Sequence, residues 1–211
     1  MGNAPLKAVL DANVLFPFSL RDTLLRAAAY GLFQLYWSET ILDETTRNLV
    51  ATGRVSQAQA RRLRSAMTAH FPEAMVVGYE DLVSTMPNQE KDRHVVAAAV
   101  AAGARLIVTN NLKDFRVLPP GVHAQSPDSF LVELFEVDAE GMLEVIQAQA
   151  RALTKPTRSV QELLRGLAKA VPRFVAAVTE LNEAGTRVGA HGAQASQRHR
   201  PQPNSKAVCS R

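Results

Sequence analysis

Short apolar runs alternate with longer amphipathic segments along the first two thirds of the chain. Apolar runs of about four to eight residues that end at polar residues favour buried β-strands. They occupy residues 6–10, 33–37, 75–77 and 105–108, with a weaker run near Val122. The pattern therefore predicts five strands, of which the last is the weakest.

The segments between these runs carry helix signals. Ser38 and Ser56 stand where N-caps are expected, ahead of apolar residues at helical spacing, and Ser19 with Asp22 resembles a capping box. Gly31 is a suitable stop signal for the first helix. The predicted helices fill residues 20–30, 39–49, 57–71, 90–102 and 127–135.

Strands separated by helices indicate a parallel sheet that is covered on both faces. We therefore predict an α/β fold with three layers, α/β/α, around a central parallel sheet over residues 1–136. Residues 137–184 show only helical patterns, which predicts a C-terminal helical extension. From residue 185 onward apolar residues become rare, and Gly, Gln, Ser, Pro and Arg dominate. Residues 185–211 are therefore expected to form a disordered tail.

The composition narrows the class of protein. The chain has 211 residues, 46% of them apolar and 21% charged, which suits one folded domain with an appendage. The longest apolar run, residues 95–104, is far shorter than the roughly 20 residues that a membrane span needs. No signal peptide is recognisable at the N-terminus. The single cysteine, Cys209, excludes internal disulfides and cysteine-based metal sites, so we expect a soluble cytoplasmic protein.

The net charge of +4 is unevenly distributed along the chain. Residues 186–211 carry five basic residues and no acid: Arg187, Arg198, Arg200, Lys206 and Arg211. The other 19 basic residues and all 20 acids precede them, so residues 1–185 have a net charge of −1. The basic character belongs to the expected tail and does not by itself indicate a nucleic-acid-binding surface on the folded part.

The candidate chemistry lies where the predicted strands end, because ligands of parallel α/β sheets bind at the carboxyl ends of the strands. The polar side chains expected at this edge are Asp11, Asn13, Glu44, Asp92, Thr109, Asn110, Asn111 and Asp114. Four of them are carboxylates, which repel one another unless a hard cation binds between them. Oxygen ligands of this kind suit Mg²⁺ or Mn²⁺.

Four pieces of the sequence, in this order, resemble the PIN-domain family of metal-dependent ribonucleases, which includes the VapC-type toxins. They are VLDANVL at residues 9–15, Glu44 in the helix after the second strand, KDRHVVAAA at 91–99 and LIVTNNLKDF at 106–115. Each piece alone is a weak signal. The ordered set spans roughly residues 6–135 and is specific.

The resemblance implies a central parallel sheet with an acidic pocket for Mg²⁺ or Mn²⁺. It assigns catalysis and metal binding to Asp11, Glu44, Asp92 and Asp114, with polar support from Asn13, Thr109 and Asn110. Some family members have an acid where this chain has Asn110 or Asn111, so the last metal ligand rests on Asp114 alone. The extension over residues 137–184 is not part of the minimal family domain and inherits no role from it.

The activity that the resemblance implies is hydrolysis of RNA phosphodiester bonds by an endoribonuclease that depends on Mg²⁺ or Mn²⁺. A narrow acidic cleft favours single-stranded RNA. The cationic residues expected to contact the RNA are Arg93, Lys113, Arg116 and the arginines of residues 54–64. As the toxin of a toxin–antitoxin pair, the chain would have a cognate antitoxin protein as partner. Whether it also forms a homodimer is left open by the sequence.

Other interpretations of the same residues remain open. Asp11 alone could begin a loop, Asp92 could be a first-turn acid favoured by the helix dipole, and His94 is expected to be a partly exposed helix residue. A receiver-type phosphoacceptor domain would need a second acid beside the acceptor, and an aspartate-nucleophile phosphatase would need an acid in place of Asn13. A catalytically degenerate PIN-like domain that binds RNA or protein is the remaining alternative.

Overall fold

The computed structural model describes residues 6–154 and 156–182. Two compact units are distinguished, Met1–Val175 and Ala176–Arg211. The described part of the second unit, residues 176–182, is helical, and the expected tail over residues 185–211 lies outside the described residues. No helix in the described part of the chain is long and apolar enough to cross a membrane.

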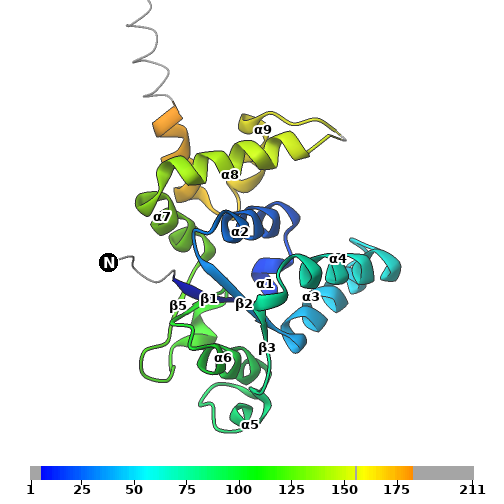
Figure 1. The fold of residues 1–211 in the computed structure, drawn as a ribbon, viewed down its shortest axis with the longest axis vertical. Helices are drawn as coiled ribbons and strands as arrows, with labels where there is room; N and C mark the ends of the chain where they lie inside the picture. The colour runs from blue at the N-terminus through cyan, green and yellow to red at the C-terminus, as the bar shows by residue number, and fades with distance from the viewer. Residues whose placement is uncertain (1–5, 155, 183–211) are drawn as a thin grey trace, which may run out of the picture. The chain divides into compact units, whose positions relative to one another are not determined.

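A single parallel sheet of five strands organises the first unit (Figure 1). The strands are β1 (Lys7–Leu10), β2 (Gln34–Ser38), β3 (Met75–Val76), β4 (Leu106–Val108) and β5 (His123–Gln125). They pair in the order β3-β2-β1-β4-β5, and every pair is parallel. The predicted α/β fold is confirmed, and the weak run near Val122 is the edge strand β5.

Helices fill most of the remaining chain. They are α1 (Ala12–Leu15), α2 (Phe18–Tyr30), α3 (Glu39–Ala51), α4 (Gln57–His70), α5 (Glu80–Val83), α6 (Glu90–Ala102), α7 (Pro127–Val137), α8 (Ala139–Ala152) and α9 (Val160–Leu167), with a further helix over 172–182. Two short 3₁₀ turns are η1 (Pro72–Ala74) and η2 (Leu112–Phe115). The predicted caps of α3 and α4 are confirmed, since the side chains of Ser38 and Ser56 accept backbone N–H bonds there.

The capping box predicted at Ser19 is wrong. Helix α2 begins two residues earlier than predicted, at Phe18, and its N-cap position is Pro17, which makes no side-chain cap bond. The ring of Pro17 fixes its φ, and the residue is extended just before the helix. The helix therefore starts directly after Pro17, without a polar cap. The predicted stop is confirmed, because Gly31 ends α2 with φ 92°, a left-handed conformation that glycine adopts without steric cost.

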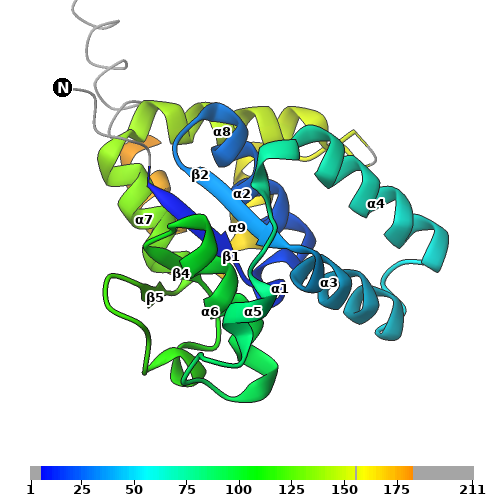
Figure 2. The ribbon, with the colours of Figure 1, turned by 60° about the horizontal axis from the view of Figure 1, so that its bottom comes forward.

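The strand order places helices on both faces of the sheet. Connections between parallel strands are right-handed, so the steps β1–β2 and β2–β3 put α2 and α3 on one face, and the return from β3 to β4 puts α6 on the other. Helix α6 packs against β1, β2 and β4, whereas α2 and α3 contact β2. In Figure 2, α6 lies in front of the sheet and α2 behind it. This is the three-layer arrangement that the sequence predicts.

The central strands β1 and β4 are the most buried part of the sheet. Every residue of β4 is fully buried, as are Ala8, Val9 and Leu10 of β1. The chain leaves β1 toward β2 on one side, and β4 lies on the other side, so the strand order reverses between β1 and β4. In open α/β sheets a crevice forms outside the carboxyl ends of the strands at such a point. Functional side chains are therefore expected just after Leu10 and Val108.

The helices that follow the sheet pack against α2 and against one another. Helix α8 contacts α2 and α7, and a buried polar bridge joins α8 to α2. The Thr23 hydroxyl donates to Gln149 Oε1 at 2.8 Å, and Gln149 Nε2 donates to the Ser19 carbonyl at 3.0 Å. Both Thr23 and Gln149 are fully buried. A domain boundary near residue 136 stays a prediction.

Candidate metal centre

Asp11 and Thr109 follow two neighbouring strands at the same edge of the sheet. β1 and β4 are paired in register from Ala8 to Leu10, so the residues that follow them are neighbours. The Asp11 N–H donates to the Val108 carbonyl at 3.1 Å, and the Thr109 hydroxyl donates to Asp11 Oδ2 at 2.7 Å. Both side chains are buried. The carboxylate of Asp11 is thus held in place from the adjacent strand.

Asn13 joins these two residues to the loop after β4. Its side-chain amide donates to Asp11 Oδ2 and, at 2.9 Å, to the Thr109 hydroxyl. The side-chain oxygen of Asn13, Oδ1, accepts the Asn110 backbone N–H at 2.9 Å. The structure therefore gives Asn13 and Thr109 the positions of orienting groups around Asp11, whereas the exposed Asn110 takes part mainly through its backbone.

Glu44 and His94 meet between helices α3 and α6. His94 Nε2 lies 3.3 Å from Glu44 Oε1. The expectation that His94 is partly exposed is wrong, because only 8% of the residue is accessible. The alanine-rich helix α6 packs closely on the sheet. The His94 side chain is on the side of α6 from which it reaches Glu44 of α3. Sequence spacing gave no signal for this pair, because the contact depends on how two helices pack.

Asp92 and Asp114 share one cation. Asp92 stands in the first turn of α6 and Asp114 in η2, and the Lys91 ammonium lies 3.8 Å from Asp92 Oδ2 and 2.9 Å from Asp114 Oδ2. Asn111 also donates a side-chain N–H to Asp114 Oδ2. Lys91 was not predicted as a site residue, although its place beside Asp92 was a usable signal.

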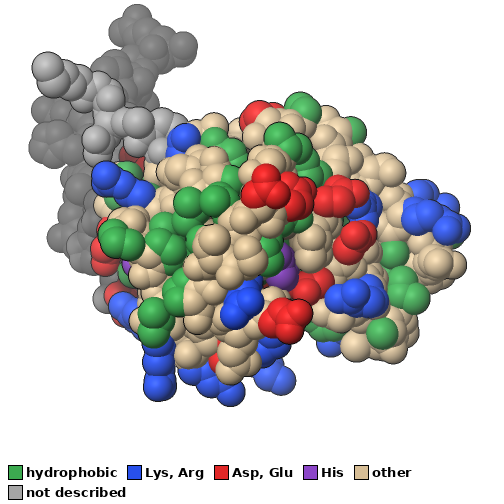
Figure 3. All heavy atoms as spheres, turned by 90° about the horizontal axis from the view of Figure 1, so that it is seen from below, with side chains coloured by type: hydrophobic (Ala, Val, Ile, Leu, Met, Phe, Trp, Pro, Cys, Tyr) green, Lys and Arg blue, Asp and Glu red, His purple; other side chains and the backbone are tan. Residues whose placement is uncertain are grey.

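The four acids act on one another electrostatically. Burial raises the pKa of Asp11, and the nearby charge of Glu44 raises it further, whereas the bond from Thr109 lowers it. Burial also raises the pKa of Asp92, with Asp114 and Glu44 acting in the same direction and Lys91 against it. The pKa of Asp114 is instead lowered, chiefly by the bond from Lys91. Figure 3, which views the molecule from below Figure 1, shows acidic side chains near a histidine, with basic side chains beside them.

Comparison with known proteins decides the family. The profile of the PIN-domain family matches residues 7–113, about half of the chain, from β1 to the start of η2. This chain belongs to the PIN-domain family. The match contains Asp11, Glu44 and Asp92 and ends one residue before Asp114. Membership of the PIN-domain family argues against the two alternatives of a receiver-type phosphoacceptor domain and an aspartate-nucleophile phosphatase.

Two further similarities concern the VapC group of PIN domains. Residues 127–180, which begin with α7, match the VapC50 C-terminal domain. The chain is also 38% identical over 119 residues to a protein of Mycobacterium tuberculosis (strain ATCC 25618 / H37Rv) that bears the name "Putative ribonuclease VapC50". That alignment covers 55% of this chain and 70% of the relative.

The donor set of this PIN domain fits a divalent metal ion in its chemistry. Among residues 6–154 and 156–182, no group of three or more His, Cys, Asp or Glu side chains is gathered closely enough to hold one. The acids at this edge nevertheless offer carboxylate oxygens, which hard cations prefer as ligands. Within the described chain, the buried Oδ2 of Asp92 has no hydrogen-bond partner. A buried carboxylate oxygen of this kind is costly unless a cation is near it, and the Lys91 ammonium, 3.8 Å away, is such a cation in this structure.

The cationic residues expected to contact RNA are only partly free to do so. Lys113 and Arg116 are exposed beside Asp114, whereas Arg93 donates to the Asn88 carbonyl at 2.9 Å. Among the arginines of residues 54–64, the Arg54 guanidinium lies 4.9 Å from the centre of the Phe16 ring. The guanidinium of Arg64 bonds to Asp43 and Glu39 and joins α4 to α3.

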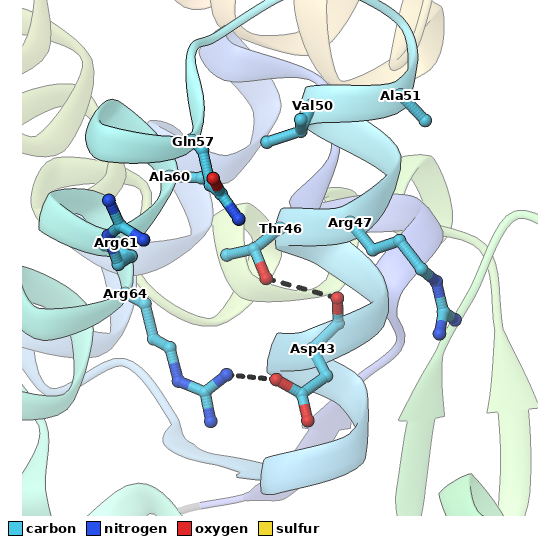
Figure 4. Close-up of a pocket in the computed structure, with 9 residues that line it drawn as sticks. All are labelled: Asp43, Thr46, Arg47, Val50, Ala51, Gln57, Ala60, Arg61 and Arg64. Carbon is cyan, nitrogen blue, oxygen red and sulfur yellow. Dashed lines mark hydrogen bonds and ion pairs between the residues drawn. The ribbon is translucent and has the colours of Figure 1, made fainter.

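A cavity of about 570 Å³ lies between α3 and α4, next to the helix that carries Glu44 (Figure 4). It is lined by Asp43, Thr46, Arg47, Val50, Ala51, Gln57, Ala60, Arg61 and Arg64. Figure 4 shows Arg64 directed at Asp43, while Arg61 extends from α4 without touching an acid among the residues drawn. The exposed Arg47 reaches within 3.9 Å of Glu44. The sequence could not predict this cavity, because it depends on the distance between two helices.

Proposed function

We propose that this PIN domain is an endoribonuclease that needs Mg²⁺ or Mn²⁺ and acts in the cytoplasm. The observation that carries the proposal is the acidic edge of the sheet, where Asp11 is held by Asn13 and Thr109 and a buried oxygen of Asp92 lacks a hydrogen bond among the described residues. The name of the mycobacterial relative, a ribonuclease, supports the choice of RNA as substrate.

Each residue of the edge has a part in this proposal. Asp11, Asp92 and Asp114 would hold the metal ion, which when bound lowers the pKa of a coordinated water and offsets the charge that develops on the phosphate. Asn13 and Thr109 fix the orientation of the Asp11 carboxylate. Glu44, beside His94, is placed to hold the ion or to orient the attacking water.

We expect cations near this acidic edge to hold the RNA strand. Lys113 and Arg116 offer them beside Asp114, and Arg47 and Arg61 offer them at the α3–α4 cavity. Backbone phosphates bind such side chains without regard to sequence. We expect single-stranded RNA, because an unstacked strand enters a narrow site more easily than a duplex does.

Asp92→Asn tests the catalytic assignment. The substitution removes one charge and almost no volume, so the circular dichroism spectrum should stay unchanged. Cleavage of a labelled single-stranded RNA with Mn²⁺ should fall by more than the roughly 10–100-fold that loss of an outer partner of a metal ligand costs. Glu90→Gln is the matched control, because Glu90 is an exposed acid in the same first turn of α6. Equal activity of Asp92→Asn and wild type would overturn the proposal and favour the degenerate, RNA- or protein-binding alternative.

The finer proposal is that the nuclease is the toxin of a toxin–antitoxin pair. It is supported by the 38% identity over 119 residues to the mycobacterial VapC50 and by the match of residues 127–180 to the VapC50 C-terminal domain. Induced expression of the chain should stop bacterial growth, whereas Asp92→Asn should not. Co-expression of a short protein encoded directly upstream should restore growth, and toxicity that Asp92→Asn retains would contradict the proposal.

A further inference from the structure

Lys91 places an ammonium group among the acids of the candidate metal centre. Its Nζ lies 2.9 Å from Asp114 Oδ2 and 3.8 Å from Asp92 Oδ2, so one side chain connects α6 with η2. Both carboxylates are proposed metal ligands. A divalent cation bound by Asp92 and Asp114 would therefore have to lie where their oxygens now face this ammonium.

The three side chains differ in their freedom to move. The Lys91 side chain is 62% exposed, whereas the side chains of Asp92 and Asp114 are only 15% and 11% exposed. The ammonium therefore reaches the two acids from solvent on a flexible stem, and it can leave without disturbing the packing of α6. The carboxylates have no comparable freedom, since they are held between the packed elements.

The contacts of Lys91 with Asp92 and Asp114 differ from an ordinary solvent-exposed ion pair. Exposed pairs usually join one acid and one base, and they contribute little to stability. Here one ammonium serves two acids from different elements, and the Asp92 oxygen that it faces is buried without a hydrogen bond in the described residues. The position of the charge is therefore tied to the acidic edge itself.

We propose that Lys91 is a built-in competitor of the divalent cation, neutralising Asp92 and Asp114 until a metal ion displaces its ammonium to solvent. The inference rests on the proposed function, since it takes both acids as metal ligands. Two charges of the same sign cannot lie against the same carboxylates without a large electrostatic cost. Lys91 would thus set the metal concentration at which the site fills.

Calorimetric titration of the full chain with Mn²⁺ tests this competition. Lys91→Met keeps the length of the side chain and removes the charge, so Mn²⁺ should bind about three- to tenfold more tightly than to wild type. Lys91→Arg keeps the charge and should bind Mn²⁺ like wild type. Lys113→Met is the matched control, because Lys113 adjoins Asp114 in sequence but has no ion pair among the described residues. Its effect should be much smaller than that of Lys91→Met.

Thermal melts give a second measurement that does not depend on activity. In EDTA, Lys91→Met should melt below wild type, because Asp92 and Asp114 lose their shared counter-charge. With Mn²⁺ present the difference should shrink or reverse, since the variant binds the ion more tightly.

The possible outcomes separate the two proposals. Equal Mn²⁺ affinity of wild type and Lys91→Met, or tighter binding by Lys91→Arg as well, would overturn the role of Lys91 and leave the nuclease proposal intact. No Mn²⁺ binding by either wild type or Lys91→Met would overturn both. Binding by Lys91→Met alone would support the competition in its strongest form.

Discussion

At the scale of single residues, the acids of the candidate metal centre affect stability with opposite signs. Burial raises the pKa of Asp92 above its ordinary value of 3.8, so the charged form is less favourable in the folded chain than in the unfolded one. The fold therefore loses stability as pH rises from 3.8 through the raised pKa, and at neutral pH the charge of Asp92 is a net cost. The lowered pKa of Asp114 has the opposite effect: its contribution is complete above 3.8 and is lost as pH falls through the lowered pKa.

Two variants measure these signs. In EDTA at pH 7, Asp92→Asn should melt above wild type, because it removes a buried charge that neighbouring acids repel. Asp114→Asn should melt below wild type, because it removes the main partner of Lys91. Thermal melts of the three proteins give both results, and Mn²⁺ should stabilise wild type more than either variant, since each lacks a proposed ligand. A stabilised Asp114→Asn would show that the pair with Lys91 contributes nothing to folding.

The sequence predicted part of this centre and could not predict the rest. Asp11 and Thr109 follow apolar runs, so their meeting at one sheet edge is a consequence of parallel pairing. The pairs of His94 with Glu44 and of Lys91 with Asp114 depend on rotamers and on the packing of α6 against α3 and η2. No periodicity in the sequence carries that information. The identity of the ligands themselves stays a prediction until the metal is titrated.

At the scale of elements, the helices and strands with a clear hydrophobic pattern were predicted well, whereas the shortest helices were missed. The strands fall within a residue or two of their predicted ranges, because a run of buried residues has to begin and end at polar ones. The four-residue helices α1 and α5 were missed, since one turn gives no measurable period. The error at Ser19 arose because the local capping signal competed with Pro17, and the backbone of proline decided where α2 begins.

The bridge between α2 and α8 should contribute measurably to stability. Gln149→Leu removes the bonds from the Thr23 hydroxyl to Gln149 and from Gln149 to the half-buried Ser19 carbonyl, while the bond of Thr23 to the Ser19 carbonyl at 2.9 Å remains. A typical hydrogen bond contributes about 0.5–1.5 kcal/mol, so loss of the two bonds should lower the melting temperature by a few degrees. Gln147→Leu is the control, because Gln147 lies on the same helix and is exposed. Equal melting temperatures for the two variants would mean that α8 contributes nothing through this bridge.

At the scale of the whole molecule, the positive charge that could attract RNA lies in a different part of the sequence from the acids of the candidate metal centre. Residues 1–185 have a net charge of −1, and an acidic edge by itself repels a polyanion. Residues 186–211 supply a charge of +5. If RNA is the substrate, as proposed, we expect residues 186–211 to provide most of the long-range attraction, whereas the acids with a bound metal ion would act on the RNA once it arrives.

Removing residues 186–211 should accordingly change RNA binding and leave folding almost unchanged. Each phosphate neutralised on a single strand contributes about 0.7 to the slope of log Kobs against log salt concentration, so loss of five charges should flatten the slope by up to about 3.5. The melting temperature should stay close to that of the full chain, because this segment has few apolar residues to bury.

Fluorescence anisotropy with a labelled RNA measures this slope, and the Asp92→Asn background prevents cleavage during the measurement. A full-length variant with Arg187, Arg198, Arg200, Lys206 and Arg211 replaced by Gln separates charge from length and should match the truncation. An unchanged salt slope in both proteins would show that RNA is held by the cations around the acidic edge alone, and a large fall in melting temperature on truncation would show that the segment packs.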